Sequence, residues 1–254
     1  MIFILKHIKE ALWSVKPENK AFLLANPSWR SLLYLLILSL SPLLAKAQLA
    51  IISDPDGYTN VREKGDIRSP VNFKIYDDQV FTLVDWGTSK RPKWLPLKMS
   101  QAFDTLRCKD TKFQYGYMHD SRILELKDFE NQFETTVQEN LAFVETDKLK
   151  VELTVNPKPK RPDYKTCLLG TDQGVGELSN QLKSLSVNIN GKPITIPEED
   201  LKYLYIIDLS SFDVFQQGNL TILYVGTRSV ACFYQCAWVI KDGEYLKRYL
   251  YFGE

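Results

Sequence analysis

The sequence has little histidine and little cysteine, the residues on which many hydrolase and metal sites depend. It contains two histidines, His7 and His119, and four cysteines in 254 residues. A nucleophile–histidine site needs a histidine beside a serine or cysteine, and a zinc hydrolase normally uses at least two histidines. His7 lies in a predicted leader segment, so His119 alone remains, and we interpret it as a structural or surface residue. We therefore predict no catalytic residues, no metal and no cofactor, and hence a protein that is not an enzyme.

An excess of charge is also missing. Lys and Arg number 32 and Asp and Glu number 31, which leaves a net charge of +1. Nucleic-acid binders carry a basic stripe or patch, so we expect no nucleic-acid partner. The hydrophobic fraction of 44% is enough to bury a core, and the length fits two small domains.

Paired carboxylates could still serve a hydrolase, because a glycosidase acid and base need no fixed sequence spacing. Asp54 and Asp56, and also Asp77 and Asp78, lie in predicted turns, where solvated side chains are expected. The glycine-rich segment 170–176 lacks the Gly-Lys-Ser/Thr ending of a phosphate-binding loop. A carboxylate-dependent hydrolase is kept as a second alternative.

One long apolar run is present, at residues 32–44. About 13 residues are too few to span a bilayer, which needs roughly 20, but they match the core of a signal peptide. Lys16, Lys20 and Arg30 precede the run, and the small-x-small sequence Ala-Lys-Ala follows it at 45–47.

We therefore predict that residues 1–47 form a signal peptide that is cleaved before Gln48. The protein would then be periplasmic or secreted, with no stable membrane span after cleavage. The alternative is an uncleaved anchor that reaches back to Ala21, although Asn26, Pro27 and Arg30 would interrupt it. No cysteine follows the run directly, so no bacterial lipid anchor is indicated.

The four cysteines leave the disulfide pattern open. Cys232 and Cys236 are four apart on one predicted strand, about 13 Å along it, while a disulfide needs Cα atoms within roughly 7 Å. These two should not pair with each other. Either buried free thiols or one disulfide remains compatible with Cys108, Cys167, Cys232 and Cys236.

The pattern after residue 48 is mainly β. Short alternating apolar runs are separated by Gly, Pro, Asn and Asp turns, and the Asn-Gly pair at 190–191 is a strong hairpin signal. In the linker, 127–147, Phe129, Phe133, Val137 and Leu141 recur every four residues, so we predict a connecting helix. The strands are predicted at 49–52, 71–75, 79–84, 94–98, 113–118, 148–155, 185–189, 220–225, 230–240 and 245–252.

Two segments resemble a bacterial SH3-type domain. The first is Asp-Pro-Asp-Gly-Tyr-Thr-Asn-Val-Arg at 54–62, followed by Lys74, Ile75 and Phe81. The second is the closing segment at 116–123, which carries Gly116, Tyr117, His119, Ser121, Arg122 and Ile123. The resemblance covers 48–126 and implies a small SH3-like barrel. The stretch 86–111 is longer than the family pattern, which affects the loops around any ligand groove.

The remainder, 148–254, is predicted to be a second β-rich (α+β) domain, with a short helix beginning near Pro197. It is similar to a domain of unknown function that accompanies SH3-type domains in exported proteins of the Bacteroidetes group. The similarity rests on 170–172, 190–192 and 238–245. That resemblance implies no activity.

The barrel region is rich in aromatic residues, which offer contact area at little entropic cost. As candidate ligand-binding residues we select Tyr58, Tyr76, Trp86, Trp94 and Tyr117. The resemblance implies a non-catalytic module that recognises cell-wall peptide or glycan, with peptidoglycan as partner. The first alternative is a protein-interaction or inhibitor module that binds a protein partner through the C-terminal domain.

Overall fold

The computed structural model describes residues 49–84, 90–104, 109–159, 180–205, 207–226 and 234–252. Side chains of 101–104, 109–112 and 252 are outside this description. The predicted signal peptide 1–47, the aromatic candidate Trp86, and Cys108, Cys167 and Cys232 lie outside the described residues, as does the glycine-rich segment 170–176. Among the described residues, no helix has the length and apolar character needed to cross a membrane.

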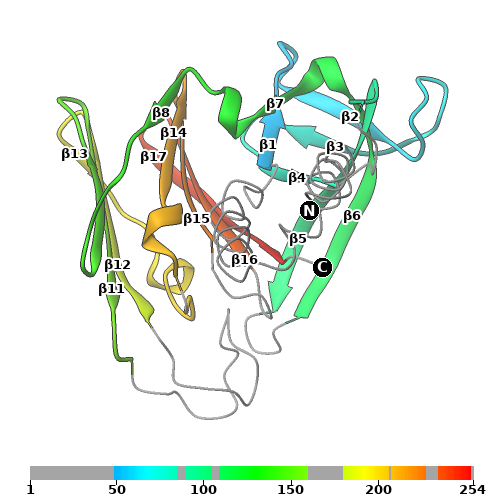
Figure 1. The fold of residues 1–254 in the computed structure, drawn as a ribbon. Coiled ribbons are helices and arrows are strands. Elements are labelled where there is room, and N and C mark those ends of the chain that lie inside the picture. Colours follow the sequence, from blue (N-terminus) through cyan, green and yellow to red (C-terminus); the bar gives the residue numbers. More distant parts are fainter. Residues whose placement is uncertain are drawn as a thin grey trace, which may run out of the picture. The chain divides into compact units, whose positions relative to one another are not determined.

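The mainly β class is confirmed, because strands in three antiparallel sheets account for most of the described residues (Figure 1). The helical elements in these ranges are short 3-10 turns, so the helical share expected of an α+β domain is not found there. The first sheet has seven strands in the order β3-β2-β6-β5-β4-β1-β7. Its strands are β1 (Leu49–Ile52), β2 (Tyr58–Arg62), β3 (Val71–Tyr76), β4 (Phe81–Leu83), β5 (Trp94–Asp104), β6 (Lys109–His119) and β7 (Ile123–Glu125).

Alternation along the strands explains why this sheet forms. In β2, Thr59 and Val61 are buried, while the residues on either side of them are half-buried. The turn before β2 contains Gly57 at φ +72°, a conformation that favours glycine. A 3-10 turn, η2 (Asp120–Arg122), joins β6 to β7, and β7 pairs with β1. The first and last strands of the segment are therefore neighbours.

The other two sheets have five strands each. Their orders are β13-β12-β11-β10-β9 and β17-β16-β15-β14-β8. A single cluster of buried side chains draws residues from both sheets, including Val151, Leu153, Trp238 and Leu250, so the sheets pack face to face over one core. Their strands are β8 (Asn131–Phe133), β9 (Thr136–Gln138), β10 (Leu141–Glu145), β11 (Leu149–Asn156), β12 (Gln181–Ile189), β13 (Lys192–Ile194), β14 (Asp213–Gln217), β15 (Leu220–Gly226), β16 (Tyr234–Lys241) and β17 (Glu244–Phe252). The remaining 3-10 turns are η3 (Leu126–Asp128), η4 (Glu198–Asp200) and η5 (Leu209–Ser211).

Two hairpins of the sandwich follow the turn chemistry of the sequence. Asn190 and Gly191 have φ values of +53° and +79° and join β12 to β13. Asp242 and Gly243 have values of +54° and +73° and join β16 to β17. Two successive positive φ angles are the mark of a type I′ turn, which matches the twist of the flanking strands.

The predicted helical linker at 127–147 is wrong. The structure has η3 there, followed by β8, β9 and β10, and these strands belong to the two sheets of the sandwich. A spacing of four satisfies a strand as well as a helix, because four is a multiple of the strand period of two. Thr135, Thr136 and Val137 are β-branched and favour the strand. The sandwich therefore begins near residue 131 and not at 148.

The central strands β15 and β16 are buried along almost their whole length, on both faces. One face meets the opposite sheet of the sandwich. The sandwich also contacts the seven-stranded sheet. The Tyr251 hydroxyl of β17 donates a hydrogen bond to the Val80 carbonyl at 2.5 Å, and Lys241 of β16 forms an ion pair with Asp77 at 2.9 Å. The seven-stranded sheet and the sandwich are therefore in direct contact within the compact unit Gln48–Glu254.

Candidate functional site

Four of the five predicted ligand-binding residues lie on one face of the seven-stranded sheet. Directly opposed residues of an antiparallel pair share a face. Tyr58 is opposite Tyr76, Arg62 is opposite Tyr117, and Trp94 is opposite His119. Alternation along β2 and β6 joins these pairs into one continuous face. We call Tyr58, Tyr76, Trp94, Tyr117 and His119 the aromatic face; Trp86, the fifth candidate, lies outside the described residues.

Trp94 and His119 form the best-defined contact of the aromatic face. Their ring centroids are 5.3 Å apart and the rings are nearly perpendicular, at 87°. This edge-to-face arrangement is a favourable geometry for aromatic pairs. Both side chains are half-buried, so each keeps part of its surface open to solvent.

The loop 63–70 borders this pair. A Cβ added to Gly65 would lie 2.9 Å from the Cβ of Trp94 and 3.6 Å from the ring of Tyr117. Only glycine therefore allows the loop backbone to come this close to both aromatic residues. The loop is held by the Arg62 guanidinium, which donates to the Ser69 carbonyl at 2.6 Å, and by the Ser69 hydroxyl, which accepts from the Lys64 amide at 3.0 Å.

A second group of side chains lies at the end of the β2–β3 hairpin that is farther from loop 63–70. The rings of Tyr58 and Tyr76 are 6.3 Å apart, and the Lys74 ammonium lies 3.9 Å from the centroid of the Tyr58 ring. This is a cation–π contact. Half of the surface of Tyr76 is exposed. Because β2 runs antiparallel to β6, the Tyr58 end of β2 points toward the His119 end of β6.

His119 has a defined tautomer when neutral. Its Nδ1 accepts from the Ser121 amide at 3.3 Å and lies 2.8 Å from the Ser121 hydroxyl. An Nδ1 that accepts a backbone hydrogen bond leaves the proton on Nε2. The ring thus presents an N–H donor beside Trp94.

The chain that leads into Trp94 is anchored by Arg91. Its guanidinium binds Asp120 of η2 at 2.6 Å and also Glu125 of β7. Lys127 binds the other oxygen of Glu125 at 2.8 Å. Burial disfavours the charged form of Glu125, but the hydrogen bonds and charges of Lys127 and Arg91 outweigh it, so its pKa lies below its usual value. This network fixes the position at which β5 begins.

Two of the predicted turn acids, Asp54 and Asp77, make structural contacts. The Asp54 side chain accepts from the Thr59 hydroxyl at 2.6 Å and pairs with Arg122 at 3.1 Å, and only 8% of it is exposed. The prediction that Asp54 is a solvated turn residue is therefore wrong, because Thr59 and Arg122 enclose it. Asp77 pairs with Lys241. Within the described ranges, no group of three or more His, Cys, Asp or Glu residues is arranged to hold a metal ion.

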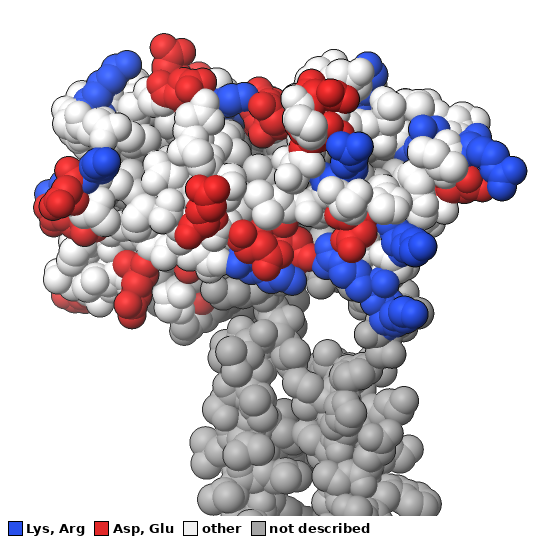
Figure 2. Space-filling view, turned by 90° about the horizontal axis from the view of Figure 1, so that it is seen from above, with Lys and Arg blue, Asp and Glu red and all other residues white. Residues whose placement is uncertain are grey.

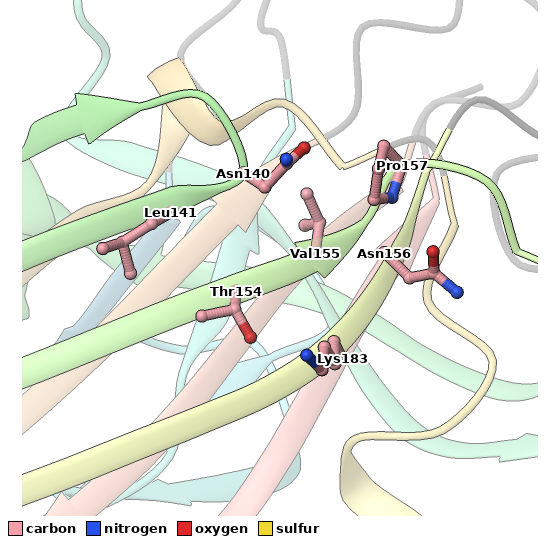
Figure 3. Close-up of a pocket in the computed structure, with 7 residues that line it drawn as sticks. All are labelled: Asn140, Leu141, Thr154, Val155, Asn156, Pro157 and Lys183. Carbon is pink, nitrogen blue, oxygen red and sulfur yellow. The ribbon is translucent and has the colours of Figure 1, made fainter.

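A separate pocket lies on the sandwich, at the ends of β10, β11 and β12 (Figure 3). Its volume is about 570 Å³. The described residues that line it include neither an aromatic ring nor a carboxylate, and Lys183 is their one charged side chain. The pocket contains none of the predicted site residues. Its lining consists of Asn140, Leu141, Thr154, Val155, Asn156, Pro157 and Lys183.

The sandwich also holds a polar cluster around Asp200. The Tyr245 hydroxyl donates to its carboxylate at 2.6 Å, Arg248 lies 3.5 Å from that carboxylate, and Trp238 Nε1 donates to the Asp200 carbonyl at 3.0 Å. These bonds fasten η4 to β16 and β17. Cys236 is a free thiol in the same core, and burial raises its pKa well above the usual range. The cluster is best explained as an anchor for the segment after β13.

Sequence reasoning missed Lys74, Gly65 and the position of His119. His119 could have been found from its parity, because it continues the alternation of Tyr115 and Tyr117 one residue beyond the predicted strand 113–118. The contact of Gly65 with Trp94 had no sequence signal, since 29 positions separate them. Comparisons of the chain with protein-family models, with curated proteins and with solved structures found no match.

Proposed function

We propose that this protein is an exported, non-catalytic binding protein whose N-terminal module is of the bacterial SH3 type and recognises cell-wall peptide or glycan. One observation carries the proposal: Tyr58, Tyr76, Trp94 and Tyr117, chosen from sequence, share one face of one sheet. Clustered aromatic side chains, bordered here by the hydrogen-bonded loop 63–70, supply contact area for a ligand.

The strand order supports the SH3-type assignment. A hairpin of β2 and β3 follows the first strand, and a 3-10 turn precedes the last strand, which pairs with the first. The stretch 86–111, which is longer than the family pattern, includes much of the paired strands β5 and β6.

The distribution of exposed apolar side chains favours this surface over the C-terminal one. Large hydrophobic residues that are well exposed include Ile67, Val71, Tyr76 and Tyr115 on the N-terminal sheet and its loop. In the described part of the sandwich they are Val137 and Leu246, on different sheets. A protein-binding role of the sandwich would need a larger apolar patch.

The test is sedimentation of the protein with insoluble peptidoglycan at low and moderate salt. Trp94→Ala should weaken binding about tenfold, because a half-buried aromatic anchor contributes roughly 1–2 kcal/mol at a binding surface. Phe143→Ala is the matched control, since Phe143 is a half-buried aromatic on β10 of the sandwich. No retention of the unmodified protein, or equal losses in both variants, would count against the proposal.

A further inference from the structure

The charges on the aromatic face are of one sign. Arg62 on β2, Lys74 on β3 and Lys98 on β5 share this face with the aromatic residues, as their cross-strand pairings require. Over Tyr58–Arg62, Val71–Tyr76, 94–100 and 113–119, no Asp or Glu occurs. On the side of the molecule that Figure 2 views, by contrast, acidic and basic side chains are interspersed.

Loop 63–70 carries two acids, Glu63 and Asp66, whereas three acids at other ends of the strands are engaged by cations elsewhere. Asp120 is bound by Arg91 at 2.6 Å, and Asp77 by Lys241 at 2.9 Å. Asp54 is bound by Arg122 at 3.1 Å. These pairs reduce the negative potential that acids at the strand ends would otherwise impose on the face.

Lys74 and Arg62 are left without an acidic partner in the described part of the chain. The Lys74 side chain is exposed, and its ammonium contacts the Tyr58 ring at 3.9 Å. Arg62 donates to a neutral backbone carbonyl, that of Ser69. Both positive charges are therefore available to an anion that reaches the face.

From this we infer that the ligand of the aromatic face is an acidic peptide, whose carboxylate binds Lys74 while its aliphatic part packs on Tyr58 and Tyr76. The inference rests on the proposed function and names its ligand class: a cell-wall stem peptide with free carboxylates. The two rings, 6.3 Å apart and tilted by 50°, with the ammonium over one of them, offer an apolar surface and a cation side by side. Complementary charge of this kind selects a ligand and speeds its association.

The experiment compares two acetylated tetrapeptides of the cell-wall stem, one with free carboxylates and one with every carboxylate amidated. Binding to the full protein is measured by calorimetry at low and moderate salt. We expect the acidic peptide to bind about tenfold more tightly at low salt, and the difference to shrink as salt screens the charges.

Lys74→Glu should lower the affinity for the acidic peptide about tenfold and leave the amidated peptide unchanged. Lys74→Gln should give an intermediate loss. The control is Lys192→Glu, the same charge reversal at an exposed lysine on β13 of the sandwich. Thermal unfolding of each variant verifies that it folds.

Equal affinity for the two peptides, or no effect of Lys74→Glu, overturns the inference. If neither peptide binds but peptidoglycan still does in a Trp94-dependent manner, the proposed function stands and the acidic-peptide inference is overturned. If peptidoglycan is not retained either, the proposed function fails and the inference fails with it.

Discussion

Replacing Gly116 by alanine should damage both the stability of the N-terminal sheet and the candidate site. Gly116 lies on β6, next to the position at which β2 pairs with that strand. A Cβ at this position would lie 2.8 Å from the Arg62 carbonyl oxygen and would collide with the Cγ1 of Val61. Val61 is fully buried and β-branched, so its side chain has little freedom to turn away, and the carbonyl belongs to the backbone.

The expected cost is about 2–3 kcal/mol. Overpacking a close contact typically costs 1–3 kcal/mol. Alanine is favoured over glycine in a strand by roughly 0.5–1 kcal/mol, but relief of this clash requires β6 to move away from β2, and the weakened pairing cancels that gain. The cost therefore stays near the top of the overpacking range. For a unit of about 200 residues, a loss of 1 kcal/mol lowers Tm by roughly 2–4 °C, so Gly116→Ala should lower it by about 4–12 °C.

Thermal and denaturant unfolding of the purified protein measure the effect. The control is Gly218→Ala, at φ +56° with open space around its Cβ, which should cost about 1 kcal/mol from backbone strain alone. Because Arg62 pairs with Tyr117 next to Gly116, the variant should also bind peptidoglycan more weakly. A Gly116→Ala protein no less stable than Gly218→Ala would refute the reasoning.

Two further predictions concern buried ionisable groups. The Glu125 carboxyl has a pKa below its ordinary value of 4.5, so its charge stabilises the fold above that pH, and the stabilisation is lost as the pH falls through the lowered pKa. Glu125→Gln should therefore lower the free energy of unfolding by about 2 kcal/mol at pH 7. In unfolding curves below pH 4.5, the difference in this free energy between variant and unmodified protein should narrow. A difference that does not change with pH would contradict this. The Cys236 thiol is fully buried with a raised pKa, so a thiol reagent should modify it only after unfolding. Mass-spectrometric mapping of the modified cysteine checks this, and rapid labelling of Cys236 in the folded protein would show that the core is open.

Much of the local structure follows from the sequence because its signals are local. Alternation of apolar residues marked Leu149–Asn156, a continuous apolar run marked Leu49–Ile52, and the Asn190–Gly191 and Asp242–Gly243 pairs marked their hairpins. A strand's two-residue period and a turn's need for positive φ are properties of a few adjacent residues. The parity of Tyr115 and Tyr117 on β6 was readable in the same way.

Pairing between distant segments was decided only by the tertiary structure. The segment 127–147 is compatible with a helix or with strands when taken alone, and it became β8, β9 and β10 because those strands complete two sheets over a shared core. The approach of Gly65 to Trp94 and the engagement of Asp77 and Asp120 by other cations also depend on the fold. The sequence alone was enough to select Tyr58, Tyr76, Trp94 and Tyr117. Only the tertiary structure decided that they share one face, and that Lys74 has no acidic partner among the residues that the structure describes, because burial and charge pairing depend on contacts between distant chain segments.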